Sequence, residues 1–283
     1  MDPRTYLPLP VTGPGSQSDP DGSPALDYLP IPTTMDGYRR PDLPEPETAA
    51  GCAAALALMD AALAALAGPL PVVLGLDHLD ATARSFLGRA LGDGEVSLRR
   101  EADGGRCAAR AQETALAGVW IVQSLPADGG SGSEALEIAA APSIAFGVWS
   151  GAGAQPARVA PGADVMNAPA VLTELEHRRQ HFDPAAPAHV TNLSLLPFTP
   201  ADHDWLGASL GRGPLTVLSR GYGNCRLAAC ALPNLWRVQY FNSMDTLILD
   251  TVELTALPEI VCAAPEDLAD SRERLAEIRA LYA

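Results

Sequence analysis

The sequence LGRALGDG at residues 87–94 returns in altered form as LGASLGRG at residues 206–213, which lies 119 residues further along the chain. A second set of matches joins two tryptophan-containing stretches, residues 120–144 and 236–260, at an offset of 116 residues. Several matches in the same order, with two consistent offsets, are typical of an internal repeat. We therefore predict that the chain contains two tandem copies of one structural unit.

Each copy contains the same predicted order of helices and strands. A leading helix and a short strand are followed by a second helix, with Asp80 or Thr199 as its N-cap and Gly92 or Gly211 at its end. The strands that follow alternate large apolar residues with polar ones, as on a half-buried sheet. The expected helices lie at 48–67 and 168–181, and the expected strands at 71–76, 95–99, 190–196, 215–220 and 247–254, with further strands around Trp120 and Trp236.

The predicted fold class is α+β, built from two tandem copies of a helix-plus-small-sheet unit. A proline-rich arm precedes the copies, and a C-terminal amphipathic helix follows Pro265. We expect this helix to pack on the second copy. The expected boundaries are 1–47 for the extended arm, 48–150 for the first repeat, 151–162 for a linker and 163–283 for the second repeat.

Composition argues against several classes of function. The formal net charge is −15 and the chain has no lysine, so it lacks the basic surface that neutralises nucleic-acid phosphates. The apolar stretch 49–67 contains Asp60, and a charge inside a membrane span is costly. The chain start lacks the features of a signal peptide, and five scattered cysteines suit reduced thiols. We expect a cytoplasmic protein that binds no nucleic acid and is not integral to a membrane.

The N-terminal arm carries a short repeat of its own. Tyr6-Leu7-Pro8-Leu9-Pro10 recurs as Tyr28-Leu29-Pro30-Ile31-Pro32. A stiff, apolar polyproline strip loses little entropy when it docks on another surface. Tyr6, Pro8, Tyr28 and Pro30 are therefore candidate partner-binding residues, although the arm could instead pack on its own domain or remain a loose tail.

Three patterns that could indicate catalysis or metal binding lack the required context. Residues 207–211 fit the G-x-S-x-G nucleophile elbow, but here a helix precedes the serine and a strand follows it, the reverse of the elbow. His177 and His181 share a helix face, but the glutamate of H-E-x-x-H is missing. The cysteines have no metal-ligand spacing. We predict no catalytic residue, no metal site and no cofactor.

The segment Arg220-Gly221-Tyr222-Gly223-Asn224-Cys225-Arg226 is the sharpest motif in the chain. Its glycines permit positive φ angles and close approach of the backbone. Arg226 beside Cys225 would favour the thiolate form of the cysteine. Because loops present functional side chains from rigid strands, these seven residues are candidate partner contacts. The alternative is an ordinary β-hairpin turn with Cys225 buried.

The stretches 210–226, 234–249 and 258–267, together with GPGSQ at residues 13–17, resemble the HupH/HyaF/HoxQ family of [NiFe]-hydrogenase expression/formation proteins. The resemblance covers nearly the whole chain and is densest in the second copy. It implies an accessory chaperone, not an enzyme, for the maturation of an uptake hydrogenase. It further implies two partners, the iron–sulfur small subunit before its export and a thioredoxin-like hydrogenase chaperone.

Two other classes of function remain open from the sequence. One is a thiol-based or iron–sulfur assembly factor that uses Cys225. The other is a structural adaptor that bridges maturation factors without contacting the small subunit.

Overall fold

The computed structural model describes residues 41–45, 51–103, 105–126, 132–149, 159–220 and 224–282. Most of the proline-rich arm and most of the expected linker lie outside these ranges, so the predictions made for them stay predictions. Within the described ranges, no helix is long and apolar enough to cross a membrane.

The two halves of the chain contain the same order of helix, strand, helix and four strands. The first half runs through α1 (Ala53–Leu66), β1 (Val72–Gly75), α2 (Ala81–Leu91), β2 (Val96–Arg100), β3 (Ala108–Glu113), β4 (Val119–Leu125), β5 (Glu134–Ile138) and the 3-10 turn η2 (Ser143–Ala145). The second runs through α3 (Ala168–Gln180), β6 (His189–Asn192), η3 (Leu193–Leu195), α4 (Pro200–Leu210), β7 (Leu215–Ser219), β8 (Asn224–Ala229), β9 (Leu235–Phe241), β10 (Leu247–Leu254) and η4 (Glu259–Val261), and α5 (Pro265–Ala280) follows.

The ten strands of the described residues belong to one antiparallel sheet, in the order β1-β5-β4-β3-β2-β7-β8-β9-β10-β6. The two small sheets expected from the sequence are therefore continuous, because β2 pairs directly with β7. At this junction Leu98 lies opposite Val217, which is its match at the 119-residue offset. Counted inward from each edge of the sheet, equivalent strands of the two halves therefore follow one another in the same order.

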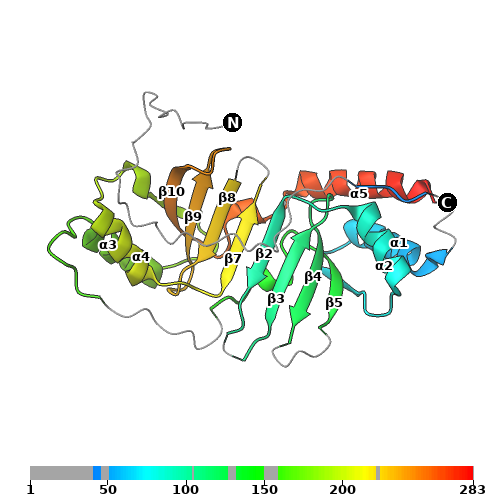
Figure 1. Ribbon diagram of the computed structural model, residues 1–283, viewed down its shortest axis with the longest axis horizontal. Coiled ribbons are helices and arrows are strands. Elements are labelled where there is room, and N and C mark those ends of the chain that lie inside the picture. Colours follow the sequence, from blue (N-terminus) through cyan, green and yellow to red (C-terminus); the bar gives the residue numbers. More distant parts are fainter. Residues whose placement is uncertain are drawn as a thin grey trace, which may run out of the picture. The chain divides into compact units, whose positions relative to one another are not determined.

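The helices of both halves cover the same face of the sheet, which we call the helix face. In the first half, α1, α2 and α5 pack with Leu136 and Ile138 of β5. In the second half, α3 and α4 pack with Val252 and Leu254 of β10. Figure 1 shows α1 and α2 near the β5 end of the sheet and α3 and α4 near the β10 end.

The opposite side, which we call the tryptophan face, buries Trp120 and Trp236 completely. Each indole N–H donates to a backbone carbonyl oxygen, that of Ala139 at 3.0 Å and that of Thr255 at 3.2 Å. These two acceptors are themselves 116 residues apart. Both tryptophans belong to a single apolar cluster, so the two halves share one core on this face.

The predicted helix caps are confirmed. Asp80 accepts a hydrogen bond from the backbone N–H of Ala83 at 2.8 Å. Thr199 accepts one from the N–H of Asp202, whose side chain in turn accepts from the N–H of Thr199. Gly92 and Gly211 end α2 and α4 at φ angles of 64° and 63°, a conformation that other residues adopt rarely.

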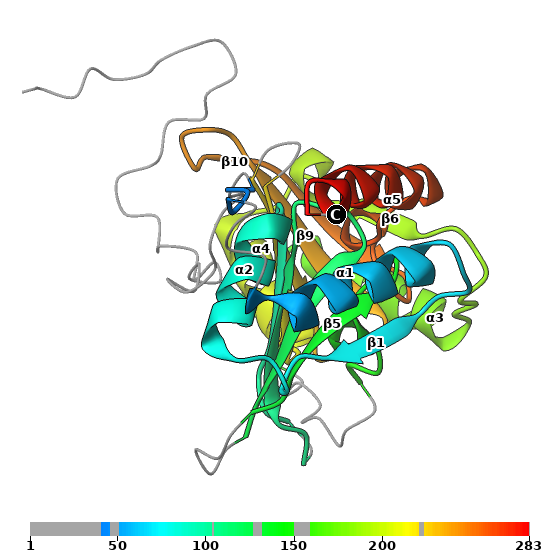
Figure 2. The same ribbon diagram turned by 90° about the vertical axis from the view of Figure 1, so that its right-hand side faces the viewer.

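Two expectations about particular elements are wrong. The strand predicted at 190–196 ends at Asn192, whose side-chain oxygen accepts from the N–H of Ser194 and starts the turn η3. The C-terminal helix α5 packs on the first half, not on the second, and places Leu275 in the core around α1. Figure 2 views the molecule from this side, with α5 beside α1. An apolar helix face shows that a helix is buried, but it does not identify what covers it.

Candidate functional site

The predicted partner-binding residues are only partly described by the structure. Those outside the described ranges, whose roles remain predictions, are Gly221, Tyr222, Gly223, Tyr6, Pro8, Tyr28 and Pro30. The structure places the others, which are Arg220, Asn224, Cys225 and Arg226. Arg220 directly follows β7, and its backbone N–H donates to the carbonyl oxygen of Glu95 at 3.1 Å.

The side chain of Cys225 points away from that of Arg226. Successive side chains of a strand point to opposite faces of the sheet, and Cys225 packs on the tryptophan face with 1% exposure. Burial raises the pKa of the Cys225 thiol to about 12, against a smaller lowering by a hydrogen bond with Tyr240. The expectation that Arg226 would favour a thiolate at Cys225 is therefore wrong, because the two side chains lie on different faces.

Asn224 and Arg226 project from the helix face and meet the hairpin that joins β9 to β10. The side-chain amide of Asn224 donates to Asp245 Oδ1 at 3.4 Å, and Arg226 Nη2 lies 3.5 Å from the same oxygen. The guanidinium carbon of Arg226 lies 4.2 Å from the ring centroid of Phe241, within the range of a cation–π contact. The start of β8 and the hairpin therefore form one connected surface.

The hairpin tip, residues 242–246, is shaped by Asn242. Its side-chain oxygen accepts from the backbone N–H groups of Met244 and Thr246, both at 2.9 Å. Asp245 follows at a φ of 57°, a conformation that Asp and Asn tolerate better than most residues. The turn leaves Met244 70% exposed. This tip belongs to the stretch 234–249 that resembles the hydrogenase expression/formation family, and its sequence predicts no role for it.

A row of polar side chains crosses the helix face in the first half. Arg110 Nε donates to Gln123 Oε1, and Gln123 Nε2 donates to Glu134 Oε1. Glu134 also forms an ion pair with Arg84. Arg110, Gln123 and Glu134 lie on the neighbouring strands β3, β4 and β5, so each side chain of this row has a hydrogen-bonding partner beside it.

The matching row in the second half consists of Arg226, Gln239 and Asp250, each 116 residues further along the chain. Here Arg237 binds both carboxylate oxygens of Asp250, at 3.1 and 2.6 Å. In the part of the chain that the structure describes, the buried atoms Arg226 Nε and Gln239 Nε2 have no hydrogen-bonding partner. Ile121 occupies the position that matches Arg237, which explains why the first row is complete and the second is not.

Sequence reasoning missed these two rows, although one signal could have found them. The 116-residue offset that relates the tryptophans also relates Arg110 to Arg226, Gln123 to Gln239 and Glu134 to Asp250. A polar residue repeated on a buried strand indicates a hydrogen-bonding partner, since burial of unpaired polar groups is costly.

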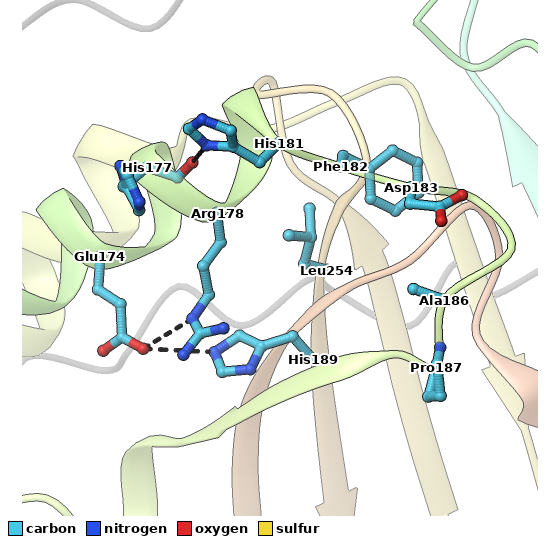
Figure 3. Close-up of a pocket in the computed structure, with 10 residues that line it drawn as sticks. All are labelled: Glu174, His177, Arg178, His181, Phe182, Asp183, Ala186, Pro187, His189 and Leu254. Atoms are coloured by element: carbon cyan, nitrogen blue, oxygen red, sulfur yellow. Dashed lines mark hydrogen bonds and ion pairs between the residues drawn. The ribbon is translucent and has the colours of Figure 1, made fainter.

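A pocket of about 460 Å³ lies between the end of α3, the following loop and β6. Figure 3 shows Glu174, Arg178 and His189 pointing toward one another. Arg178 Nε donates to Glu174 Oε1 at 2.8 Å, and His189 Nε2 lies 3.6 Å from the same oxygen. Burial, followed by the charge of Arg178, lowers the pKa of His189. The pocket thus presents a partly neutralised carboxylate and an imidazole.

The motifs considered for catalysis and metal binding take structural positions. Ser209 lies inside α4, so no strand-to-helix elbow exists at this serine. His181 Nδ1 lies 2.9 Å from the carbonyl oxygen of His177, and the two imidazole rings are 4.8 Å apart. No group of three or more His, Cys, Asp or Glu side chains within the described ranges could hold a metal ion. The absence of a cofactor stays a prediction.

Comparison with known proteins adds a family to this geometry. The family described as "HupH hydrogenase expression protein, C-terminal conserved region" matches residues 57–148 and again residues 165–282. The hydrogenase expression/formation protein HupQ of Azotobacter chroococcum mcd 1 is 47% identical over 98% of this chain and 97% of its own length. HoxQ of Cupriavidus necator is 43% identical over 96% of both chains, and the hydrogenase-1 operon protein HyaF of Escherichia coli K12 is 31% identical over 95% and 94%.

The fold and site define a mixed helix-and-sheet protein with an antiparallel sheet. Its candidate functional surface lies where the start of β8 meets the hairpin between β9 and β10. The chain belongs to the HupH family of hydrogenase expression/formation proteins, as the resemblance in the sequence implied. Among solved structures, the hydrogenase expression protein HupH from Thiobacillus denitrificans is similar at 31% identity, with a TM-score of 0.38 over 40% of this chain and 95% of that chain.

Proposed function

We propose that this protein is an accessory factor, not an enzyme, in the maturation of an uptake [NiFe]-hydrogenase. The names of its full-length relatives support this role, since they are called hydrogenase expression/formation proteins. We further propose that it works in the cytoplasm as a chaperone that binds the iron–sulfur small subunit before export, beside a thioredoxin-like hydrogenase chaperone.

The proposed contact surface is formed by the start of β8 and the hairpin tip, residues 242–246. The observation that carries it is the joint contact of Asn224 and Arg226 with Asp245. This contact connects the segment 220–226 to a turn that presents Met244 to solvent. Exposed apolar side chains beside arginine are common at protein–protein interfaces. The surface therefore has the composition of an interface, while its cysteine is buried and protonated.

We also propose that the two halves arose by duplication of one unit. Support comes from the two separate matches of the same family to residues 57–148 and 165–282. Further support comes from the equivalent hydrogen bonds of Trp120 and Trp236. In this view the proline-rich arm is an addition to the duplicated unit and supplies a second contact surface through Tyr6, Pro8, Tyr28 and Pro30.

The proposal is tested by affinity purification of the tagged protein from a hydrogenase-producing cell. The wild-type chain should retain the small subunit. The double variant Tyr222→Ala, Arg226→Ala should retain much less of it and slow hydrogenase maturation. Unchanged retention together with normal maturation would reject the contact surface. Retention that depends on the thioredoxin-like chaperone but not on the small subunit would favour an adaptor instead.

A further inference from the structure

We propose that Arg226 and Gln239 form a binding site for a carboxylate group of a partner protein. The proposal deepens the function proposed above, on which it rests only for the identity of that partner. Arg226 and Gln239 are directly opposite each other on β8 and β9, on the helix face beside the hairpin tip. Side chains of directly paired residues lie about 5 Å apart at their Cβ atoms, so one ligand group can contact both.

Two buried donors identify this pair as a site. Gln239 is 5% exposed, and within the described residues neither its Nε2 nor Arg226 Nε has an acceptor. Buried donors in folded proteins are nearly always paired, and an unpaired one is costly. In the first half the same two residue types are both paired, since Arg110 donates to Gln123 and Gln123 donates to Glu134. The second half contains the same donors, but the carboxylate of its row, Asp250, is bound by Arg237.

The chemistry of the pair favours a carboxylate over a neutral acceptor. A guanidinium group and an amide NH₂ offer hydrogen-bond donors to a single group, and charge-assisted hydrogen bonds are the stronger ones. The ring of Phe241, whose centroid lies 4.2 Å from the guanidinium carbon, stabilises the cation through a cation–π contact. In the first half the side-chain amide of Gln123 donates to the carboxylate of Glu134, so the protein itself provides an example of this pairing.

A ligand reaches the pair from the side of Arg226. The side chain of Arg226 retains 13% exposure and forms an ion pair with Asp245, whose Oδ1 lies 3.5 Å from Nη2. The side chain of Asp245 is 63% exposed, so water and salt screen this ion pair. A carboxylate from a partner can displace Asp245 and, after rotation of the guanidinium group, accept from Nε and from Gln239 Nε2 together.

The test is NMR titration of the full-length protein, with the Nε–H signal of Arg226 and the side-chain amide signals of Gln239 as reporters. One probe is a short glutamate–glycine peptide blocked at both ends, which offers side-chain carboxylates. The other is a glycine–serine peptide with a free C-terminus, which offers a terminal carboxylate. We expect both reporters to shift with one probe at up to millimolar concentration. The responding probe identifies the source of the carboxylate, and no shift with either would overturn the proposal.

Variants separate this site from a general effect on the fold. Gln239→Leu should weaken peptide binding about tenfold, and Gln239→Glu should abolish it, because the new carboxylate occupies the site from within. Gln123→Leu, the matched change in the first half, should leave the affinity unchanged. Equal affinities in all three variants would contradict the site. If peptides bind but the small subunit does not, the carboxylate site stands and the proposed partner is wrong.

Discussion

The two halves of the sheet place an arginine, a glutamine and an acid at matching positions, but only in the first half are the three joined by hydrogen bonds. Arg110, Gln123 and Glu134 form a complete row. In the second half Asp250 is bound by Arg237 instead, and the buried donors of Arg226 and Gln239 have no acceptor among the described residues. Arg237, in place of Ile121, therefore takes the acid out of the second row and leaves a candidate binding site where the first half has a structural row.

Under the duplication proposed above, the two halves keep one arrangement of helices and strands and differ in their side chains. Both tryptophans keep the same hydrogen bond, and both second helices keep their caps. The differences that alter the two polar rows lie on the helix face, where Arg237 takes the place of Ile121 and Asp250 that of Glu134. Such changes can alter what a surface binds without removing the apolar cores, which dominate stability.

The largest expected effect comes from removing the arginine that distinguishes the halves. In Arg237→Ile, the carboxylate of Asp250, which is 2% exposed, loses its bidentate partner. Loss of one partner of a buried ion pair costs about 3–5 kcal/mol, and the free energy of unfolding in urea should fall by that order. The double variant Arg237→Ile, Asp250→Leu should recover most of the loss. A double variant no more stable than the single one would show that the ion pair is not the cause.

Glu113 in the first half matches Ala229 in the second, and its ionisation should destabilise the fold. Burial, only partly offset by the hydrogen bond from the N–H of Gly118, raises the pKa of Glu113 to about 7. A raised pKa in the folded state means stability that is present at low pH and is lost as the pH rises through 7. Glu113→Gln keeps an acceptor for Gly118 but cannot ionise, so it should raise the free energy of unfolding by roughly 2–3 kcal/mol at pH 8.

The control for this prediction is the same pair of proteins at pH 4. At this pH the side chain at position 113 is uncharged in the folded wild type and in the variant, so the two free energies of unfolding should agree. A gain from Glu113→Gln that is the same at both pH values would contradict the assignment, since it would not depend on the proton. The measurement is urea unfolding followed by tryptophan fluorescence, because Trp120 pairs with Glu113 across β3 and β4.

Replacement of the two glutamines should change the free energy of unfolding by smaller amounts and in different directions. Gln123→Leu interrupts a satisfied row and leaves Glu134 and Arg110 short of a partner, so it should cost about 1–2 kcal/mol. Gln239→Leu removes an unsatisfied buried donor and should be neutral or stabilising by up to about 1 kcal/mol. Thermal unfolding of both variants under the same conditions provides the comparison. Equal losses in the two variants would show that the two rows do not differ as described.

The features that the sequence predicted correctly are local ones. Asp80 and Thr199 cap helices that begin one residue later, and Gly92 and Gly211 end them through their own φ angles. The features that could not be predicted depend on contacts between distant parts of the chain. The pairing of β2 with β7 and the packing of α5 on α1 are set by which apolar surfaces remain uncovered. The alternation of side chains on β8 could have predicted that Cys225 and Arg226 face opposite ways.

The smallest change in stability should accompany a clear change in binding. Asp245→Asn removes the acid that competes for Arg226, while asparagine tolerates the φ of 57° at this position and can still accept from Asn224. An exposed ion pair contributes less than about 1 kcal/mol, so the unfolding midpoint should hardly move. Binding of the blocked glutamate–glycine peptide should strengthen severalfold, most clearly at low ionic strength, where exposed charges are least screened. If the affinity is unchanged at low salt, Asp245 does not compete for Arg226, and the carboxylate must enter the second-half row by another route.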